Sequence, residues 1–317
     1  MSDMSSIIEV EGLTRRFGEL VAVNGVEFDV AEGEIFGFLG PNGAGKTTTV
    51  RMLTGVIDPT EGTARIEDHD IRKEPLGARE HLGIVPEEAN VYLDLSVWRN
   101  VMIMAELHAM PKAEREEKAR DLLERLGLGD RHRQKARALS KGLRQRLMLC
   151  SALVSGPEIL FLDEPTGGLD VQSTRLIHEI VREMNDDGLT VFLTTHDMVE
   201  AEQLCDRVAI ISEGEIVATD TPEHLQEAMA SSQYVDVTFA GGDPPPDALK
   251  KLGGVNRVDS TDGGWHLYTD KPGQVTVQVV KYAQTCGLGI GNIATCKPTL
   301  EDVFVYLTSD QKEGEQQ

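Results

Sequence analysis

The sequence predicts an α/β fold in which a parallel sheet is joined by an antiparallel sheet, a helical insert and a small C-terminal α+β domain. Apolar and polar side chains alternate through the first 33 residues, which is the period of antiparallel strands with one face in water. Later strands differ, because they are short continuous apolar runs that end in polar or glycine residues. Such runs are buried on both faces, as in parallel sheets. They occupy 34–40, 158–164, 190–196 and 207–214.

The ends of these runs carry the residues that are able to bind ligands or take part in catalysis. In open parallel sheets, ligands bind beyond the carboxyl ends of the strands. Those ends hold a glycine-rich loop, two adjacent acids and a histidine. Ahead of the run at 158–164 we expect a mainly helical insert, about 88–155. Within it, a charged helix has an apolar face formed by Leu122, Leu123 and Leu126.

A second domain is expected beyond a boundary near 221–233, where the sequence ASSQ is typical of a linker. The first domain is placed at 5–225 and the second at 233–310. Trp265 and Tyr268 are expected in the core of the second domain. Its expected elements are a strand at 234–240, a hairpin through 255–270, a helix over 273–286, a strand at 288–295 and a final helix through 299–308.

Composition excludes several functional classes. The 317 residues carry 53 acidic and 31 basic side chains, and the net charge of −22 repels phosphate backbones, so no nucleic-acid partner is expected. This acidity fits either a salty cytoplasm or an ordinary soluble surface. The four cysteines form no CxxC pair, and Cys150 and Cys205 are expected to be small buried hydrophobes. No apolar run approaches the roughly 18 residues that span a bilayer, and no signal peptide is recognised, so a cytoplasmic location is expected.

The sequence GPNGAGKT follows a predicted strand and precedes a helix, which is the context of a phosphate-binding P-loop. Backbone N–H groups of such a loop surround the β-phosphate, Lys46 reaches the β- and γ-phosphates, and Thr47 offers a hydroxyl to Mg²⁺. A P-loop NTPase core is therefore predicted, with kinases, GTPases and transport ATPases all open. The expected nucleotide contacts are Gly40, Pro41, Asn42, Gly43, Ala44, Gly45, Lys46, Thr47 and Thr48.

Two acids and a histidine indicate hydrolysis. Asp163 and Glu164 end the apolar run ILFLDE. Asp163 can bind Mg²⁺ through a water, and Glu164 can polarise an attacking water or take its proton. His196 ends the next run and can donate an N–H to the γ-phosphate while holding Glu164 in line. The alternatives are a solvated acidic strand end and a structural histidine.

A second anion-binding pattern occurs at ALSKGLRQRL, residues 138–147, where a serine and a glycine precede an apolar helical run. A helix N-terminus of this kind binds anions. The chain therefore carries two phosphate-binding devices that lie far apart in the sequence.

Together and in this order, the motifs resemble those of the nucleotide-binding subunits of ATP-binding-cassette transporters, over about residues 5–225. GPNGAGKT resembles the Walker A loop, ILFLDE the Walker B strand, GGLD with Asp170 the D-loop, and TTHD the switch-histidine loop. LSKGLRQR resembles the signature usually written LSGGQ, from which it departs at Lys141 and Leu143, and lysine-bearing forms occur among exporter subunits. The resemblance implies an exporter-type ATPase that uses ATP and Mg²⁺.

The resemblance also explains why one chain has two phosphate-binding devices. Subunits of this family meet head to tail, and each ATP lies between the P-loop of one subunit and the signature of the other. This implies that Ser140, Lys141 and Gly142 contact the γ-phosphate of a partner's ATP, in a homodimer or a heterodimer. ATP then holds the dimer together and hydrolysis releases it.

Phe17 and Glu87 acquire roles from the same resemblance. Phe17 stands where the family places an aromatic ring under the adenine, and the alternative is a core phenylalanine at a strand end. Glu87 stands where the family usually has a glutamine that ligates Mg²⁺ and senses the γ-phosphate. A carboxylate still binds Mg²⁺, so Thr47, Glu87 and Asp163 are the expected metal set. The alternative for Glu87 is a neutral substitution.

Separately encoded transmembrane permease subunits are implied as partners, which would hold the chain on the inner face of the cell membrane. Tyr92, Leu95 and Trp98 lie where such subunits receive a helix of the membrane partner, although ordinary core packing explains Trp98 equally well. The C-terminal segment, ending TLEDVFVYLT, resembles the accessory domain of drug- and polysaccharide-export ATPases. In this family the membrane subunit selects the substrate, so none is inferred.

Two other functions are weighed against transport. A soluble cassette ATPase that acts on ribosomes or DNA would carry two cassettes or a long coiled coil, and the charge of −22 disfavours it. A regulatory module that binds ATP without hydrolysis is disfavoured by the intact Glu164 and His196.

Overall fold

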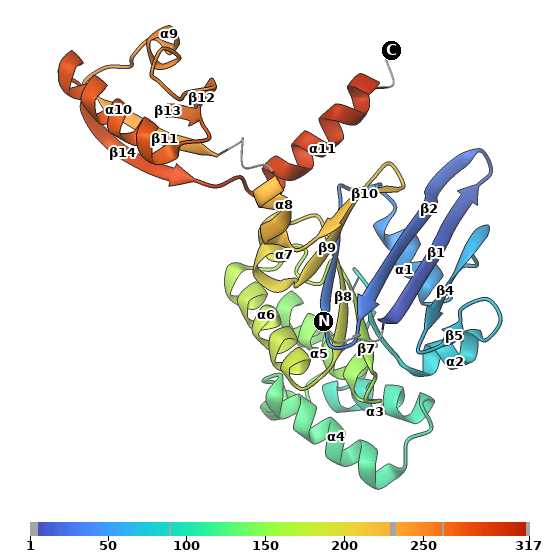
Figure 1. The fold of residues 1–317 in the computed structure, drawn as a ribbon. Helices are drawn as coiled ribbons and strands as arrows, with labels where there is room; N and C mark the ends of the chain where they lie inside the picture. Colours follow the sequence, from blue (N-terminus) through green and yellow to red (C-terminus); the bar gives the residue numbers. More distant parts are fainter. Residues whose placement is uncertain (1–5, 89, 229–232, 262, 315–317) are drawn as a thin grey trace. The chain divides into compact units, whose positions relative to one another are not determined.

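The chain forms two compact units, Met1–Thr221 and Pro222–Gln317 (Figure 1). The computed structural model describes residues 6–88, 90–228, 233–261 and 263–314. Of the linker sequence ASSQ, residues 230–232 lie outside the described residues. Each unit has its own hydrophobic core.

An antiparallel sheet forms from the N-terminal segment, as its alternating pattern predicts. Its strand order is β2-β1-β4-β5, and β1 pairs antiparallel with both β2 and β4. In β1 the side chains of Ile8 and Val10 are buried while Glu9 between them is exposed. The strands are β1 (Ser6–Phe17), β2 (Leu20–Ala31), β4 (Glu61–Ile66) and β5 (His69–Asp70).

The second sheet of this unit has the order β10-β9-β3-β8-β7-β6. The pairings of β9, β3, β8, β7 and β6 are all parallel, which confirms the interpretation of the continuous apolar runs. The antiparallel edge strand β10 and the short strand β6 were not identified from the sequence. The strands are β3 (Ile35–Leu39), β6 (Leu82–Val85), β7 (Ile159–Asp163), β8 (Thr190–Thr195), β9 (Arg207–Ser212) and β10 (Glu215–Asp220).

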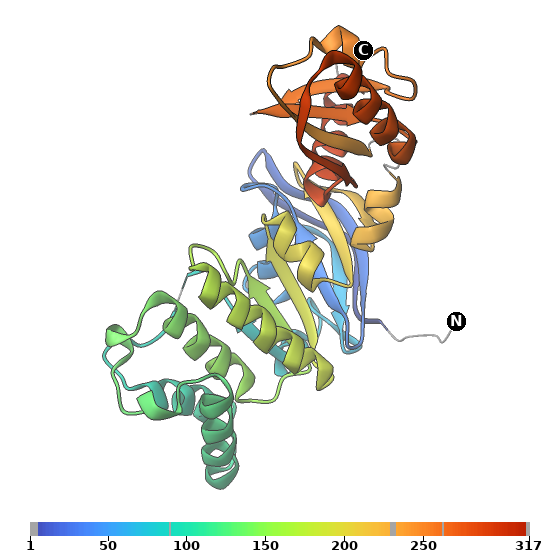
Figure 2. The same cartoon turned by 90° about the vertical axis from the view of Figure 1, so that its left-hand side faces the viewer.

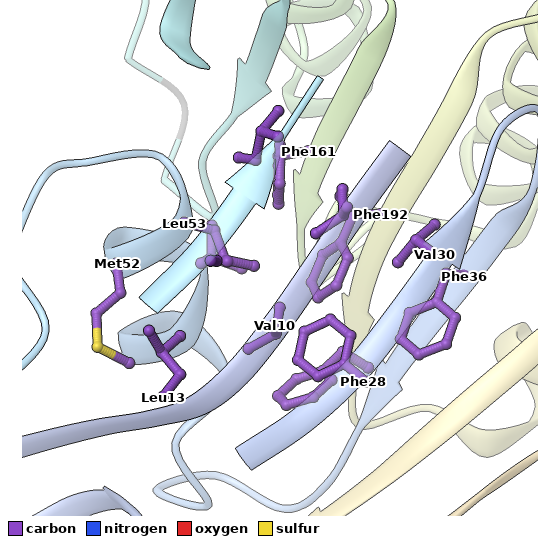
Figure 3. Close-up of a cluster of buried hydrophobic side chains, with 14 of the residues drawn as sticks. Val10, Leu13, Phe28, Val30, Phe36, Met52, Leu53, Phe161 and Phe192 are labelled. Carbon is purple, nitrogen blue, oxygen red and sulfur yellow. The ribbon is translucent and has the colours of Figure 1, made fainter. Parts of the chain in front are cut away.

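Aromatic rings join the two sheets into one core. Phe28 of the antiparallel sheet stacks on Phe36 of the parallel sheet with ring centroids 5.5 Å apart (Figure 3). The ring of Phe192 lies 5.9 Å from that of Phe28 and 5.1 Å from that of Phe161. Aromatic side chains bury more apolar area than any others and prefer such offset or tilted pairs. This core therefore holds β3, β7 and β8 against the antiparallel sheet.

Helices cover the parallel sheet and form the insert. In the insert, α3, α4 and α5 pack against one another, and Figure 2 shows them in green beside the sheet. Leu122, Leu123 and Leu126 are buried, as the apolar face of α4 predicts. The helices are α1 (Lys46–Leu53), α2 (Pro75–Glu80), α3 (Val97–Leu107), α4 (Lys112–Arg125), α5 (Lys141–Leu153), α6 (Val171–Asp186) and α7 (Met198–Leu204), with single 3₁₀ turns at Gly129–Arg131 and Ala136–Ala138.

Cys150 and Cys205 are buried free cysteines, as predicted for small hydrophobes. Burial raises the pKa of both thiols, so they stay protonated. Within the described residues, no helix combines the length and the apolar character needed to cross a membrane.

The C-terminal unit has a sheet of order β12-β13-β11-β14, with α10 packed on β11 and β14. Trp265 packs against its core, as predicted. The prediction for Tyr268 was wrong, because Leu267 is the buried neighbour and successive strand residues face opposite ways. Tyr268 instead lies 5.5 Å from the ring of Tyr234 and under the Arg257 guanidinium. The elements are α8 (Pro222–Ala228), β11 (Tyr234–Ala240), α9 (Pro246–Leu249), β12 (Arg257–Thr261), β13 (Gly264–Tyr268), α10 (Pro272–Cys286), β14 (Gly289–Cys296) and α11 (Leu300–Gly314).

Candidate active site

The glycine-rich loop connects the end of β3 to the start of α1, in the predicted strand–loop–helix context. Gly45 has φ 112° and caps α1 in a left-handed conformation, and a Cβ added there would lie 2.7 Å from the Ala22 carbonyl oxygen. A Cβ on Gly40 would collide with the Ile211 carbonyl oxygen. Only glycine fits both positions, so the loop can curl and present backbone N–H groups to a phosphate.

Lys46 is the first residue of α1, and its side chain is only 5% exposed. Its ammonium donates hydrogen bonds to the carbonyl oxygens of Gly40, at 2.7 Å, and Pro41, at 3.3 Å. The same nitrogen lies 3.1 Å from Oε1 of Glu164. That oxygen is buried and has no aligned hydrogen-bond donor among the described residues. The loop thus holds a buried cation against the carboxylate, and the carboxylate has acceptor capacity left.

Asp163 ends β7 and is 5% exposed. Its Oδ1 accepts a 2.6 Å hydrogen bond from the hydroxyl of Thr194 and a 3.4 Å one from the hydroxyl of Thr47. The structure therefore brings together two of the three predicted metal ligands, Thr47 and Asp163. A hydroxyl at the start of the P-loop helix and a carboxylate at the end of the neighbouring strand fit Mg²⁺, which prefers hard oxygen ligands.

Glu164 follows β7 with φ 51°, which is a left-handed conformation that few non-glycine residues adopt. Its N–H donates to the Thr194 carbonyl oxygen at 3.0 Å, and this bond holds the turn. The turn directs the carboxylate to two partners, because Oε2 lies 2.7 Å from Nδ1 of His196 while Oε1 faces Lys46. Backbone strain of this kind occurs at functional sites, where a side chain is held in one orientation. The alternative of a solvated acidic strand end does not fit, because the Glu164 side chain is only 10% exposed.

Glu87 and Phe17 are both exposed. Glu87 lies two residues beyond β6, which pairs parallel with β7, so it is at the same sheet edge as Asp163. In the described part of the chain Glu87 shares no hydrogen bond with Thr47 or Asp163. Phe17 ends β1 with 47% of its surface exposed, and the Arg15 guanidinium lies 4.6 Å from its ring centroid. The exposure excludes the alternative of a core phenylalanine.

The signature segment begins α5 and contacts the D-loop of the same chain. Ser140 caps the helix by accepting a 3.3 Å hydrogen bond from the Leu143 N–H. Lys141 donates a 2.6 Å hydrogen bond to the Gly167 carbonyl oxygen. A Cβ on Gly142 would lie 2.6 Å from Oγ of Ser173, so α5 and α6 approach closely there. No hydrogen bond or ion pair of the described residues joins 138–143 directly to the P-loop.

Asp170 caps α6, and the hydrogen bond from the Ser173 N–H, at 2.8 Å, lowers the pKa of this carboxyl. Nearby, a buried network that the sequence did not indicate connects three segments of the site. Glu200 is 2% exposed, accepts a 2.7 Å hydrogen bond from the Thr166 hydroxyl and lies 2.9 Å from Nε2 of His178. Thr194 was also missed, although it stands two residues before His196. No sequence pattern distinguishes these threonines, or a glutamate within a helix, from ordinary surface residues.

Of the three residues expected at one docking cleft, Tyr92 and Trp98 line different pockets and Leu95 lines neither of them. Tyr92 lines a groove with Val56, Ile84, Met104 and Leu107, between the end of α1, the end of β6 and α3. Trp98 lines another pocket, together with Arg120, whose guanidinium lies 5.6 Å from the indole ring. The two side chains lie six positions apart, but the chain between them turns into α3, and this separates them.

Comparisons with known proteins agree with this geometry. A family model described as "ABC transporter" matches residues 23–167. The daunorubicin/doxorubicin resistance ATP-binding protein DrrA of Streptomyces peucetius is 39% identical over 305 residues, covering 95% of this chain and 92% of that protein. The linearmycin resistance ATP-binding protein LnrL of Bacillus subtilis is 33% identical, with 95% and 98% covered. The Nod factor export ATP-binding protein I of Ralstonia nicotianae is 36% identical, with 95% and 94% covered.

Solved structures match part of the chain. An ATP-binding subunit of an ABC transporter superposes with a TM-score of 0.65 at 27% identity, covering 71% of this chain and 93% of that chain. The cassette MJ0796, described as dimeric and bound to ADP and Pi after hydrolysis, superposes with a TM-score of 0.62 at 27% identity, covering 68% and 98%.

The fold and the cluster around Glu164 therefore define a P-loop ATPase of the cassette type. Within that class, the chain belongs to the ATP-binding proteins of ABC transporters.

Proposed function

We propose that this chain is the ATP-hydrolysing subunit of an exporter, and that it works as a head-to-tail dimer on separately encoded membrane subunits. The observation that carries the proposal is the contact of one buried carboxylate, Glu164, with both Lys46 and His196. A P-loop lysine, a carboxylate and a histidine at one sheet edge can bind a triphosphate and activate water beside it. A module that only holds ATP needs no such aimed carboxylate.

The P-loop supplies the phosphate cradle. Backbone N–H groups of 42–48 surround the β-phosphate, and Lys46 reaches the β- and γ-phosphates. An arriving phosphate competes with Glu164 for the Lys46 ammonium, because the two anions need the same buried cation. Glu164 is then left with His196 as its partner and can accept a proton from water.

Mg²⁺ would be held by Thr47 and Asp163, whose oxygens already lie together. The ion would neutralise charge on the β- and γ-phosphates, which is its usual contribution in P-loop enzymes. Glu87, beyond the same end of the sheet, would add a third oxygen ligand to this set. Thr194 holds the Asp163 carboxylate in place for this role.

Dimerisation completes each active site. The signature helix N-terminus carries Ser140, Lys141 and Gly142, yet these residues have no direct bond to the P-loop of their own chain among the described contacts. An anion site of this kind needs an anion from elsewhere, and the ATP of a second copy or a related subunit supplies it. The neighbour MJ0796 is described as dimeric, which supports this arrangement.

The groove that contains Tyr92 is the proposed contact with the membrane partner. Val56, Tyr92 and Leu107 expose 65%, 55% and 71% of their surfaces there. Exposed apolar side chains gathered along a groove fit an amphipathic helix. Trp98 is removed from this proposal, because it lines a different pocket.

Export as the direction of transport is supported by the relatives. Two are named for resistance to drugs and one for export of Nod factor. They match about 95% of this chain and therefore share its C-terminal unit, whereas the solved cassettes cover 71% or less. The named compounds differ in chemistry, which fits selection of the substrate by the membrane subunit.

A pull-down from native membranes with mass spectrometry tests the proposal. The tagged chain should recover an integral membrane protein with about six apolar helices, each of roughly 20 residues. It should sediment with membranes when that partner is present and remain in the supernatant when the partner gene is deleted. Recovery of ribosomal or DNA-repair proteins with no integral membrane protein would contradict it.

A further inference from the structure

Lys141 connects the signature helix to the segment that carries the catalytic carboxylate. Its ammonium donates a 2.6 Å hydrogen bond to the Gly167 carbonyl oxygen. The N–H of Gly167 in turn donates to the Glu164 carbonyl oxygen at 3.1 Å. Two hydrogen bonds therefore lead from the first residue of α5 to the backbone of Glu164, whose side chain contacts His196 and Lys46.

Glycines at two positions make room for the hydrogen bond between Lys141 and Gly167. Gly168 has φ 66°, and a Cβ added to it would lie 2.6 Å from the Lys141 ammonium nitrogen. Gly142 next to Lys141 is equally confined, because its Cβ would meet the Ser173 side chain. The turn at 164–168 is further held by the Leu169 N–H, which donates to the Thr166 carbonyl oxygen at 3.0 Å. The lysine thus reaches a carbonyl in a turn that only small residues permit.

We propose that Lys141 is a positioning residue that couples the two active sites of the dimer. This inference rests on the proposed head-to-tail dimer, in which the signature of one chain faces the partner's ATP. An ammonium has three donors, so Lys141 can keep its bond to Gly167 while it donates to a phosphate oxygen. Binding of the partner's phosphate to Lys141 would then shift the turn at 164–168. That turn orients Glu164 toward the ATP bound by the chain that carries Lys141.

The coupling and a simple phosphate contact differ in which of the two active sites is affected by the loss of Lys141. A lysine that serves only the partner's phosphate affects the site across the interface, mainly through the affinity for ATP. A lysine that positions Gly167 affects the site whose Glu164 lies in its own chain, through the rate of the chemical step. The two roles therefore predict different parameters at different sites.

Hydrogen exchange of the nucleotide-free single chain tests the connection without any enzyme activity. In Lys141→Met, which keeps the length of the side chain but removes the donor, the amides of Gly167 and Leu169 should exchange about tenfold faster than in the wild type. Lys112→Met, at the exposed start of α4, is the matched control and should leave these amides unchanged. Unchanged exchange in Lys141→Met would overturn the proposal.

Mixed dimers with one working site test the coupling. One chain carries Glu164→Gln, and two different tags select the mixed species. Lys141→Met is placed either on the chain with the working Glu164 or on the Glu164→Gln chain. We expect kcat to fall about tenfold in the first arrangement, with KM for ATP changed less than about twofold. In the second arrangement the working site loses its phosphate contact, so KM should rise and kcat should fall less than in the first.

The outcomes separate this inference from the proposed function. Equal effects in the two arrangements, or an unchanged kcat in the first arrangement, would overturn the coupling while leaving the dimeric ATPase intact. Absence of ATP hydrolysis in the mixed dimer without Lys141→Met would count against the proposed function instead. The exchange experiment still decides the connection in that case, because it needs neither a dimer nor ATP.

Discussion

Nδ1 of His196 lies 2.7 Å from Oε2 of Glu164, and the other oxygen of that carboxylate lies 3.1 Å from the Lys46 ammonium. One carboxylate is thereby held between a residue of the phosphate loop and a residue of the neighbouring strand end. A buried carboxylate with only one partner would be costly, so these contacts stabilise one another. The arrangement gives Lys46 and Glu164 separate and testable tasks.

Lys46→Ala should abolish ATP binding, whereas Glu164→Gln should retain binding and lower kcat by about a hundredfold or more. The reason is that Lys46 contacts phosphate, while Glu164 acts on water. Equilibrium binding of a fluorescent ATP analogue and release of inorganic phosphate measure the two effects. Glu158→Gln, the same change just before the other end of β7, is the control and should hydrolyse ATP normally. Normal turnover in Glu164→Gln would remove the assigned role.

Phe17→Ala should raise KM for ATP about three- to tenfold and leave kcat nearly unchanged, because stacking on adenine contributes to binding alone. The ring at the end of β1 is 47% exposed, and the Arg15 guanidinium lies over it. Phe17→Tyr should restore KM. Leu20→Ala, at a residue of the neighbouring strand that is 66% exposed, should not alter it. Steady-state hydrolysis over a range of ATP concentrations measures both constants. Unchanged KM in Phe17→Ala would place the base elsewhere.

Glu87→Gln should raise the Mg²⁺ concentration for half-maximal hydrolysis about two- to fivefold, because an amide oxygen is a weaker ligand for Mg²⁺ than a carboxylate. A Mg²⁺ titration at saturating ATP measures the shift. Glu88→Gln, at the adjacent exposed position, provides the matched control. Overlapping titrations of Glu87→Gln and the wild type would show that the replacement of the usual glutamine is neutral.

Leu107→Asp should reduce recovery of the membrane partner at least about tenfold, since it would bury a charge in an apolar contact. Leu107 exposes 71% of its surface, so the substitution should not disturb folding. Leu20→Asp is the control and should leave recovery unchanged. The Leu20 side chain is 66% exposed and belongs to β2, which does not line the groove. Quantitative pull-down with equal amounts of each variant makes the comparison. Equal recovery from Leu107→Asp would exclude the groove as the contact.

Most of the parallel sheet and the residues at its edge could be predicted, because buried apolar runs and the P-loop are local patterns. The run ending at Asp163 and the run ending at His196 each identify a strand and a site residue together. The edge strand β10 escaped notice because its burial is only partial and its pairing with β9 is a hairpin without a strong turn pattern. Tyr268 was misplaced because a one-residue shift in a strand reverses the face.

Contacts between distant segments could not be predicted from single motifs. The signature departs from its usual form at Lys141, but nothing in the sequence indicates that its ammonium reaches Gly167, 26 positions away. The same holds for Thr194, whose hydroxyl orients Asp163, and for Glu200, which joins Thr166 and His178. These bonds depend on the packing of the helices against the sheet, which alternation and spacing do not encode.

The central claim is that each active site combines the P-loop of one chain with the signature of another, and a mixture of two inactive variants tests it most directly. Lys46→Ala removes the phosphate contact from one chain, and Ser140→Arg blocks the signature of the other. In a mixed dimer one site keeps an intact Lys46 and faces an intact Ser140. At equal amounts, random pairing should restore roughly a quarter of the wild-type ATPase rate, because about half of the dimers are mixed and each has one working site. Each variant alone should stay inactive. If the variants form mixed dimers and the mixture still hydrolyses no ATP, the shared active site is contradicted.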